Sequence, residues 1–161
     1  MESDFPAELG NAYRAMENSG NPWSISQTER ADWIGDMEGI EVLAGGDPFE
    51  SEWLYWVGCA GSFDDKNKKV SQAMAKLLQR ANIDVSILGP AENCTGDPAR
   101  RSGNEYIFQM LAMQNIETLD SMGVKKIITK CPHCFNTLKN EYPQLGGHYE
   151  VLHHTQLLEE L

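Results

Sequence analysis

The sequence is poor in positive charge. It holds 13 Lys and Arg against 24 Asp and Glu, which gives a formal net charge of −11. A protein that grips the phosphates of a nucleic acid needs a basic surface, and nothing in this composition provides one. The charge balance therefore argues against a nucleic-acid partner.

Long hydrophobic runs are also missing. No stretch approaches the roughly 18 consecutive apolar residues of a membrane-spanning helix. The first ten residues, MESDFPAELG, are acidic and polar, whereas a secretory signal begins basic and continues apolar. We expect a cytoplasmic chain that makes no membrane contact of its own.

Cysteine is scarce, with only four in 161 residues. Because thiols stay reduced in the cytoplasm, a disulfide framework is not expected. Hydrophobic residues make up 41% of the chain, which is enough for one packed core without such bridges. The four cysteines therefore need another role.

Residues 1–51 differ from the rest of the chain. They are acidic, contain several Gly and Pro, and predict two short helices at 7–16 and 27–37, the second opened by Ser26. No stretch among them alternates as a strand would. We interpret this segment as an N-terminal helical arm or connector that packs on a neighbouring domain and does not fold alone.

Residues 52–161 alternate between strand and helix patterns. Strands are predicted at 53–57, where Trp53, Tyr55 and Trp56 would form core, and at 83–88, 124–129 and 149–152. Helices are predicted at 65–82, from a Ser102–Glu105 capping box to about 122 with Gly123 as C-cap, and at 132–142 and 155–161. This order predicts an α/β, Rossmann-like fold: a mainly parallel sheet of about four strands flanked by helices.

The cysteines follow the predicted strands closely. One comes after each of the first two strands and a pair comes after the third, while two histidines follow the fourth: Cys59, Cys94, Cys131, Cys134, His153 and His154. The carboxyl ends of parallel strands share one edge, where ligands bind in open sheets. We therefore expect the four thiols to converge.

Several occupants fit such a group of thiols. Cys131 is placed to cap a helix whose first turn holds Pro132, which favours its thiolate form. Four thiolates suit zinc or an iron–sulfur cluster, and the remote single cysteines suit the larger cluster somewhat better. The CPHC motif before a helix also fits a thioredoxin-like redox site, although that leaves Cys59 and Cys94 unexplained. The simplest alternative is four buried structural cysteines.

The motifs WVGCAGSFDDK, ENCTGDPARRSGNEYIFQML, ITKCPHCFNTL and VLHHTQLLEEL together resemble a known family. They are similar to the cysteine-rich (CCG) domain of iron–sulfur oxidoreductases, a group that includes the B- and D-type chains of heterodisulfide reductase. The strongest resemblance is to the electron-transfer-flavoprotein:quinone oxidoreductase iron–sulfur proteins. In this family one Cys is followed by a Cys-Cys-Gly and then by a CxxC. Here 34 residues separate Cys59 from Cys94, and 36 separate Cys94 from Cys131.

The resemblance implies a cofactor and its ligands. It assigns Cys59, Cys94, Cys131 and Cys134 as ligands of a [4Fe–4S] cluster, with Zn²⁺ as the alternative. Thr95 stands where the family has its second Cys, which leaves four thiolates and argues against the noncubane double cluster of heterodisulfide reductases.

The resemblance also implies a function. The chain would be a domain excised from a larger iron–sulfur oxidoreductase, at the cytoplasmic face of the membrane in the full-length protein. It would carry electrons from an electron-transfer-flavoprotein-type donor towards a quinone, in contact with other domains or subunits, without turning over a substrate alone. The alternative from another class is a zinc-stabilised structural or docking domain.

Other residues near the cysteines are candidates for supporting roles. Arg100 and Arg101 are cations beside Cys94 and would stabilise an anionic cluster, or else pair with surface carboxylates. Gly58 and Gly96 flank ligands, where backbone has to approach the cluster closely. His153 or His154 could donate a hydrogen bond or a proton at the same edge. We expect His133, inside the CPHC motif, to point outward.

Overall fold

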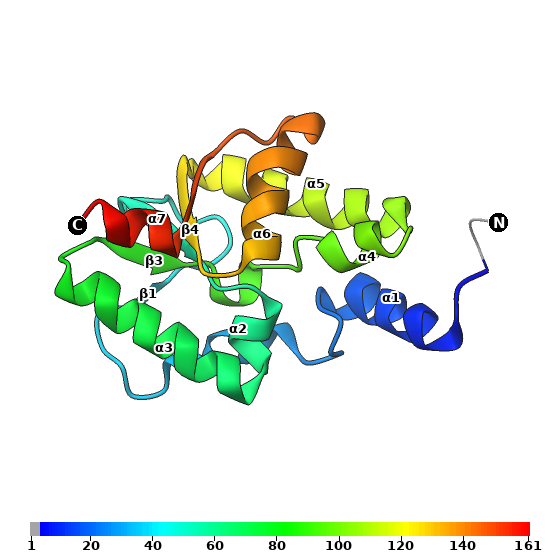
Figure 1. The fold of residues 1–161 in the computed structure, drawn as a ribbon, viewed down its shortest axis with the longest axis horizontal. Coiled ribbons are helices and arrows are strands. Elements are labelled where there is room, and N and C mark those ends of the chain that lie inside the picture. The colour runs from blue at the N-terminus through cyan, green and yellow to red at the C-terminus, as the bar shows by residue number, and fades with distance from the viewer. Residues whose placement is uncertain (1–3) are drawn as a thin grey trace.

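A five-stranded sheet organises the protein. The computed structural model describes residues 4–161, and every strand pairing among them is parallel, in the order β1-β3-β2-β4-β5 (Figure 1). The strands are β1 (Glu41–Val42), β2 (Trp53–Trp56), β3 (Val85–Ile87), β4 (Lys126–Thr129) and β5 (Glu150–His153). The expected α/β fold with a mainly parallel sheet is confirmed, with five strands where about four were predicted.

Helices connect the strands and begin or end near the predicted positions. The α-helices are α1 (Ala7–Ser19), α2 (Cys59–Phe63), α3 (Asp65–Arg80), α4 (Asp97–Arg101), α5 (Glu105–Met122), α6 (Pro132–Asn136) and α7 (His154–Glu159). Tighter 3₁₀ turns form η1 (Gln27–Ile34), η2 (Gly89–Ala91) and η4 (Tyr142–Leu145), and a π-turn forms η3 (Thr137–Glu141). Among residues 4–161, none of these helices is long and apolar enough to cross a bilayer.

The extra strand lies in the segment where none was predicted. In β1, Glu41 and Val42 pair with Ser86 and Ile87 of β3, and the Leu43 N–H donates to the Ile87 carbonyl at 2.9 Å. The prediction of no strand in residues 1–51 was therefore wrong. Strand β1 has only two residues, both exposed, which is too short for an alternating pattern. Backbone pairing with β3, and not a pattern of side chains, defines this strand. The proposed boundary at residue 51 stays a prediction.

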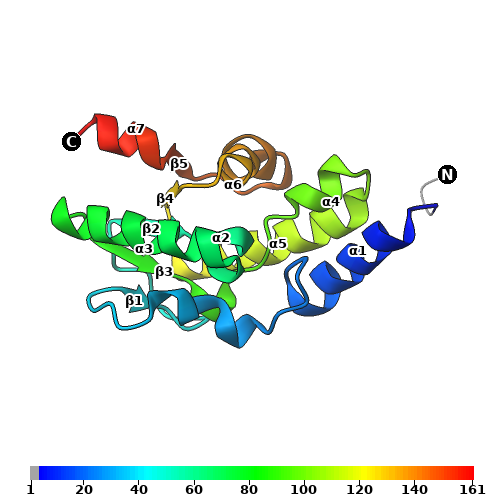
Figure 2. The same ribbon diagram turned by 60° about the horizontal axis from the view of Figure 1, so that its bottom comes forward.

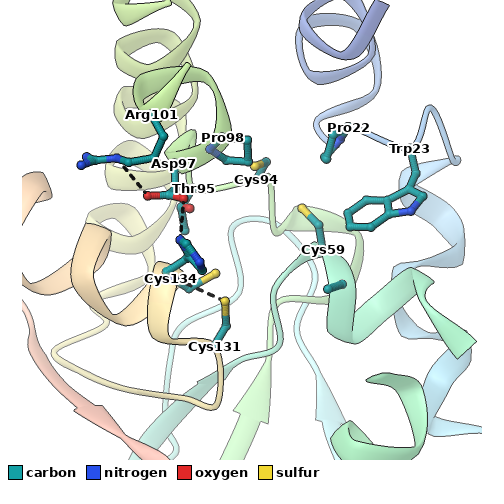
Figure 3. Close-up of a pocket in the computed structure, with 12 residues that line it drawn as sticks. Pro22, Trp23, Cys59, Cys94, Thr95, Asp97, Pro98, Arg101, Cys131 and Cys134 are labelled. Carbon is teal, nitrogen blue, oxygen red and sulfur yellow. Dashed lines mark hydrogen bonds and ion pairs between the residues drawn. The ribbon is translucent and has the colours of Figure 1, made fainter. Parts of the chain in front are cut away.

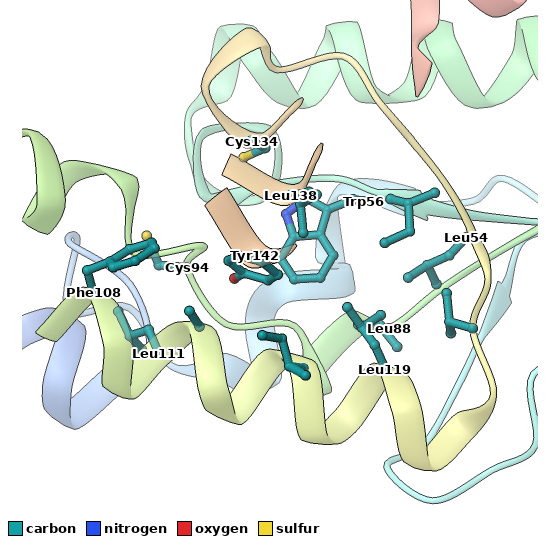
Figure 4. Packing of buried hydrophobic residues seen from close by; sticks show 14 of the residues in the cluster. Leu54, Trp56, Leu88, Cys94, Phe108, Leu111, Leu119, Cys134, Leu138 and Tyr142 are labelled. Atoms are coloured by element: carbon teal, nitrogen blue, oxygen red, sulfur yellow. The ribbon is translucent and has the colours of Figure 1, made fainter. Parts of the chain in front are cut away.

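Strand β2 divides the core into two halves. Trp53 and Tyr55 face one cluster of buried residues, and Leu54 and Trp56 face the other. All four side chains are buried, as expected for a central strand of a parallel sheet covered on both faces. Figure 4 shows the Leu54–Trp56 side, where α5 passes beneath the packed side chains.

Each face of the sheet has its own helices. Helix α5 covers the Leu54–Trp56 face with Phe108, Leu111 and Leu119, and α1 adds buried residues to the same cluster. Helix α3 covers the other face, where η1 and α7 also contribute; Met74, Leu78, Trp33 and Leu157 pack there. In the view of Figure 2, α3 overlaps β2 and β3, and α7 lies next to β5.

Two helix boundaries differ from the sequence prediction. Asn104, and not Ser102, caps α5, since its side chain accepts the Ile107 N–H at 3.1 Å. Ser102 instead closes α4, and Gly103 with φ of 96° turns the chain between the two helices. The predicted helix at 132–142 changes pitch twice, from α6 through η3 to η4. The Gly123 C-cap is confirmed.

The connections place a crossover point beside β2. From β2 the chain runs to β3 on one side and then to β4 on the other side of β2. The order therefore reverses between β2 and β4. In open α/β sheets, the crevice beyond the carboxyl ends at such a point is the usual ligand site.

Candidate functional site

All four cysteines line one cavity at that edge of the sheet. The cavity has a volume of about 410 Å³. Figure 3 shows Cys59 on one side, Cys131 and Cys134 on another, and Cys94 between Trp23 and Asp97, the first residue of α4. The remaining lining residues are Pro22, Trp23, Ala60, Thr95, Asp97, Pro98, Arg101 and His133. The expected convergence of the four thiols is thus what the fold produces.

Each cysteine lies beyond the carboxyl end of a strand. Cys59 opens α2 shortly after β2 ends, and Cys131 is the N-cap of α6 shortly after β4 ends. Cys134 lies one turn into α6, so its side chain faces the same direction as the cap. Cys94 lies in the loop that follows β3 and η2, and its N–H donates to the Gly20 carbonyl at 2.7 Å. This hydrogen bond ties the Cys94 loop to the segment after α1.

The first sulfur pair is Cys59 with Cys94. A hydrogen bond between the two side chains lowers the pKa of Cys59, and the Arg30 guanidinium lowers it further. The same hydrogen bond raises the pKa of Cys94, whose burial acts in the same direction, while the Gly96 N–H opposes the rise.

The second sulfur pair is Cys131 with Cys134. A hydrogen bond from Cys134 lowers the pKa of Cys131 to about 6, and the N–H groups of Cys134 and His133 contribute to the decrease. The Cys134 N–H lies 3.5 Å from the Cys131 sulfur, as the capping position requires. The pKa of Cys134 is raised by the same partner and by burial. The helix start therefore favours thiolate at Cys131.

The spacing of the donors bears on what they could hold. Within residues 4–161, no three His, Cys, Asp or Glu side chains are close enough together to hold one metal ion. The four thiols instead form two pairs around a shared cavity. An iron–sulfur cluster holds several iron atoms and therefore accommodates ligands that lie farther apart than the bonds of roughly 2.3 Å to sulfur around one tetrahedral ion allow. The donor set fits a four-thiolate iron–sulfur cluster.

Two buried charged residues at the site escaped sequence reasoning. Arg30 lies in η1, and its Nη2 is 3.2 Å from the Cys59 sulfur. Its partner Glu92 accepts from Arg30 Nη1 at 2.9 Å and from the Gly58 N–H at 2.8 Å. Burial raises the pKa of Glu92, which Arg30 and the backbone donors oppose. No local pattern in the sequence distinguishes Arg30 from the other arginines, or Glu92 from the other acidic residues among the 24 in the chain. Only a prediction that the N-terminal arm contacts the cysteines could have identified them.

The two arginines selected from the sequence lie differently. Arg101 lines the cavity and pairs with Asp97 at 3.4 Å and with Glu141. Arg100 does not line it. It pairs with Glu105 and Glu141, each at 3.3 Å, and stacks on Phe108. Carboxylates therefore pair with both cations, and Arg30 is the arginine that reaches a cysteine sulfur.

The two glycines are in close contact with the site. Gly58 has φ of 77°, and a Cβ there would lie 3.2 Å from the Cys134 sulfur. Gly96 has φ of 87°, and a Cβ would approach the Phe108 backbone to 3.0 Å. Both positions combine left-handed backbone with a close approach, which only glycine accommodates without strain.

Of the candidate histidines, His133 lines the cysteine cavity, whereas His153 and His154 are not among its lining residues. His153 Nε2 lies 3.1 Å from the Lys130 carbonyl oxygen, and His153 is also the N-cap of α7. His154 lines a separate small cavity, which Cys59 and Cys131 also line. His133 is 72% exposed, in keeping with the outward orientation predicted for it, but its Nδ1 also lies 3.0 Å from Asp97. That contact joins α6 to α4 beside the pair Cys131 and Cys134.

Comparison with known proteins identifies the family. The cysteine-rich domain family, CCG, matches residues 53–139, which include all four cysteines. The chain belongs to this family. The resemblance inferred from the motifs is thereby confirmed. Thr95, buried at the cavity, stands where the second cysteine of the family motif was expected.

Curated relatives match along almost the whole chain. The "EtfAB:quinone oxidoreductase" of Syntrophomonas wolfei is 45% identical over 99% of this chain and 23% of its own length. The "Probable iron-sulfur-binding oxidoreductase FadF" of Bacillus subtilis is 40% identical, also over 99% and 23%. A D-type component of the heterodisulfide reductase of Methanosarcina barkeri is 28% identical over 99% and 37%. The chain therefore spans about a quarter to a third of these proteins. No solved structure gives a significant match.

Proposed function

We propose that this chain transfers electrons through a [4Fe–4S] cluster as a domain of a larger iron–sulfur oxidoreductase. The observation that supports this most directly is the convergence of four thiols on one cavity at the crossover edge of the sheet. The names of two relatives, a quinone oxidoreductase and a probable iron-sulfur-binding oxidoreductase, agree with it.

The residues of the chain would have distinct tasks in this function. Cys59, Cys94, Cys131 and Cys134 would hold the cluster, and the cluster would supply one-electron oxidation and reduction. The Cys134 N–H donates to the Cys131 sulfur and would stabilise its negative charge. The N–H groups of Gly96 and His133 lower the pKa of Cys94 and Cys131 and would act in the same direction. Trp23, Pro22 and Pro98 line the cavity and would help to exclude water from it.

The proposal extends to the partners of the whole protein. An electron-transfer flavoprotein would donate the electrons and a membrane quinone would receive them, through other domains or subunits at the cytoplasmic face of the membrane. Residues 1–51 would serve as the connector to those parts and 52–161 as the cysteine-rich domain. The chain alone would exchange electrons without turning over a substrate.

Anaerobic purification followed by a redox titration tests the function. We expect a brown protein whose broad visible absorption bleaches on one-electron reduction and returns on oxidation. The variant Cys131→Ser should lose this absorption, while Met113→Ser, which removes an exposed sulfur from α5, should keep it. A colourless protein that holds zinc would instead establish the structural or docking role.

A further inference from the structure

Arg30 has an unusual environment for an arginine. Its side chain is fully buried, with 0% of its surface exposed. Every nitrogen of the guanidinium has an acceptor: Nε donates to Gln27 Oε1 at 2.9 Å, Nη1 to Glu92 Oε1 at 2.9 Å, and Nη2 both to the Gly20 carbonyl at 3.1 Å and towards the Cys59 sulfur at 3.2 Å. The Phe63 ring covers one face at 5.2 Å. The guanidinium is thus fixed with one N–H aimed at a proposed ligand.

Glu92 completes a connection to the backbone beside that ligand. It is 1% exposed and accepts the N–H groups of Val57 and Gly58, at 3.1 and 2.8 Å, in addition to Arg30. These two residues precede Cys59 directly. The ion pair therefore orients Cys59 twice, through its sulfur by way of Arg30 and through its backbone by way of Glu92.

A buried ion pair of this kind is a weak source of stability. Taking both charges out of water costs about as much as their attraction returns, and apolar replacements of similar volume are often neutral or stabilising. A buried pair whose only task is to hold the fold could therefore be replaced by apolar side chains at little cost. An anionic group in the adjacent cavity would give the positive member of the pair a second partner.

We propose that Arg30 is a positioning residue that donates an N–H···S hydrogen bond to Cys59 and raises the reduction potential of the cluster held there. The inference rests on the proposed function. Reduction adds a negative charge to an already anionic cluster, so a cation and a donor at a ligand sulfur stabilise the reduced state more than the oxidised state. Glu92 opposes this effect because its carboxylate places negative charge behind the same sulfur.

The proposal predicts that variants of Arg30 and of Glu92 shift the reduction potential in opposite directions, which potentiometric titration can measure. Arg30→Gln should lower the equilibrium constant for one-electron reduction about tenfold, which is about 59 mV. Arg30→Lys keeps the charge but loses the planar fork, so its shift should be smaller and of the same sign. Glu92→Gln should shift the potential upward, because Arg30 then acts without its counter-charge.

A double variant protects the experiment against failed folding. Arg30→Gln leaves Glu92 as an unpaired buried charge, whereas Arg30→Gln combined with Glu92→Gln leaves none. The double variant should titrate below the wild type and above the Arg30→Gln single variant. The matched control is Arg80→Gln, which removes a positive charge at the far end of α3 and should leave the potential unchanged.

The outcomes separate this inference from the proposed function. A wild-type chain without iron contradicts the proposed function itself. If the wild-type chain carries a cluster but its reduction potential is the same in the Arg30 variants and in Glu92→Gln, only the role of Arg30 is overturned. A shift of the same sign in all of these variants overturns that role as well. Loss of iron from the folded double variant, with iron retained in Glu92→Gln and Arg80→Gln, supports the positioning of Cys59 by Arg30.

Discussion

Replacing Gly96 by alanine should destabilise the fold strongly through two separate effects. Gly96 precedes α4 with φ of 87°, and the added Cβ would meet Phe108 at 2.9 Å on the ring and 3.0 Å on the backbone. Left-handed backbone costs a non-glycine residue about 1–2 kcal/mol. Steric overpacking against the backbone of α5, which cannot move away as a flexible side chain could, adds about 1–3 kcal/mol. The two effects together give about 2–5 kcal/mol, a large part of the stability of an ordinary domain.

Urea denaturation of the reduced, metal-free chain measures this cost. The matched control is Gly123→Ala, since Gly123 has φ of 80° but no atom within 4 Å of the added Cβ. It should lose only the backbone contribution of about 1–2 kcal/mol. If both variants lose the same free energy of unfolding, the close approach of Gly96 to Phe108 is not what requires glycine there, and the reasoning fails.

Three further predictions concern the helix caps, the thiols and the metal. Asn104→Ala should cost about 1 kcal/mol in urea denaturation by removing the α5 cap, whereas a cost confined to Ser102→Ala would restore the predicted capping box. In the reduced, metal-free chain, Cys131 should be the first thiol alkylated at pH 7, because its lowered pKa keeps it in the thiolate form above about pH 6. The alkylation rate should fall as the pH drops below that value. Peptide mapping that finds Cys94 or Cys134 labelled first contradicts this prediction. Removal of the metal should lower the free energy of unfolding by several kcal/mol, since thiolate ligands are brought together only by folding, and equal stability with and without metal would refute that link.

The sequence predicted the fold well where apolar residues form short runs or recur at helical spacing. Four of the five strands are short apolar runs with buried side chains, and the long helices α3 and α5 place buried residues at helical spacing. The placement of the cysteines after successive strands was enough to predict their convergence, because parallel strands share one carboxyl edge. Strand β1 carries no such signal, since two exposed residues pair through backbone alone.

The surroundings of the thiols were harder to predict. Arg100 and Arg101 were chosen because they are close to Cys94 in sequence, yet acidic side chains from α5 and η3 pair with them. Arg30 is 29 residues from Cys59 and belongs to the segment interpreted as an arm. Its contact with the sulfur depends on how η1 packs against α2 and α3, which no local pattern encodes.

Native mass spectrometry of the anaerobically purified chain tests the central claim most directly. We expect one species that carries a single [4Fe–4S] cluster per chain, and we expect the cluster to be lost in Cys59→Ser, Cys94→Ser, Cys131→Ser and Cys134→Ser alike. A chain that carries one zinc ion, or a Cys131→Ser variant that keeps the full wild-type complement of iron and sulfide, would contradict it.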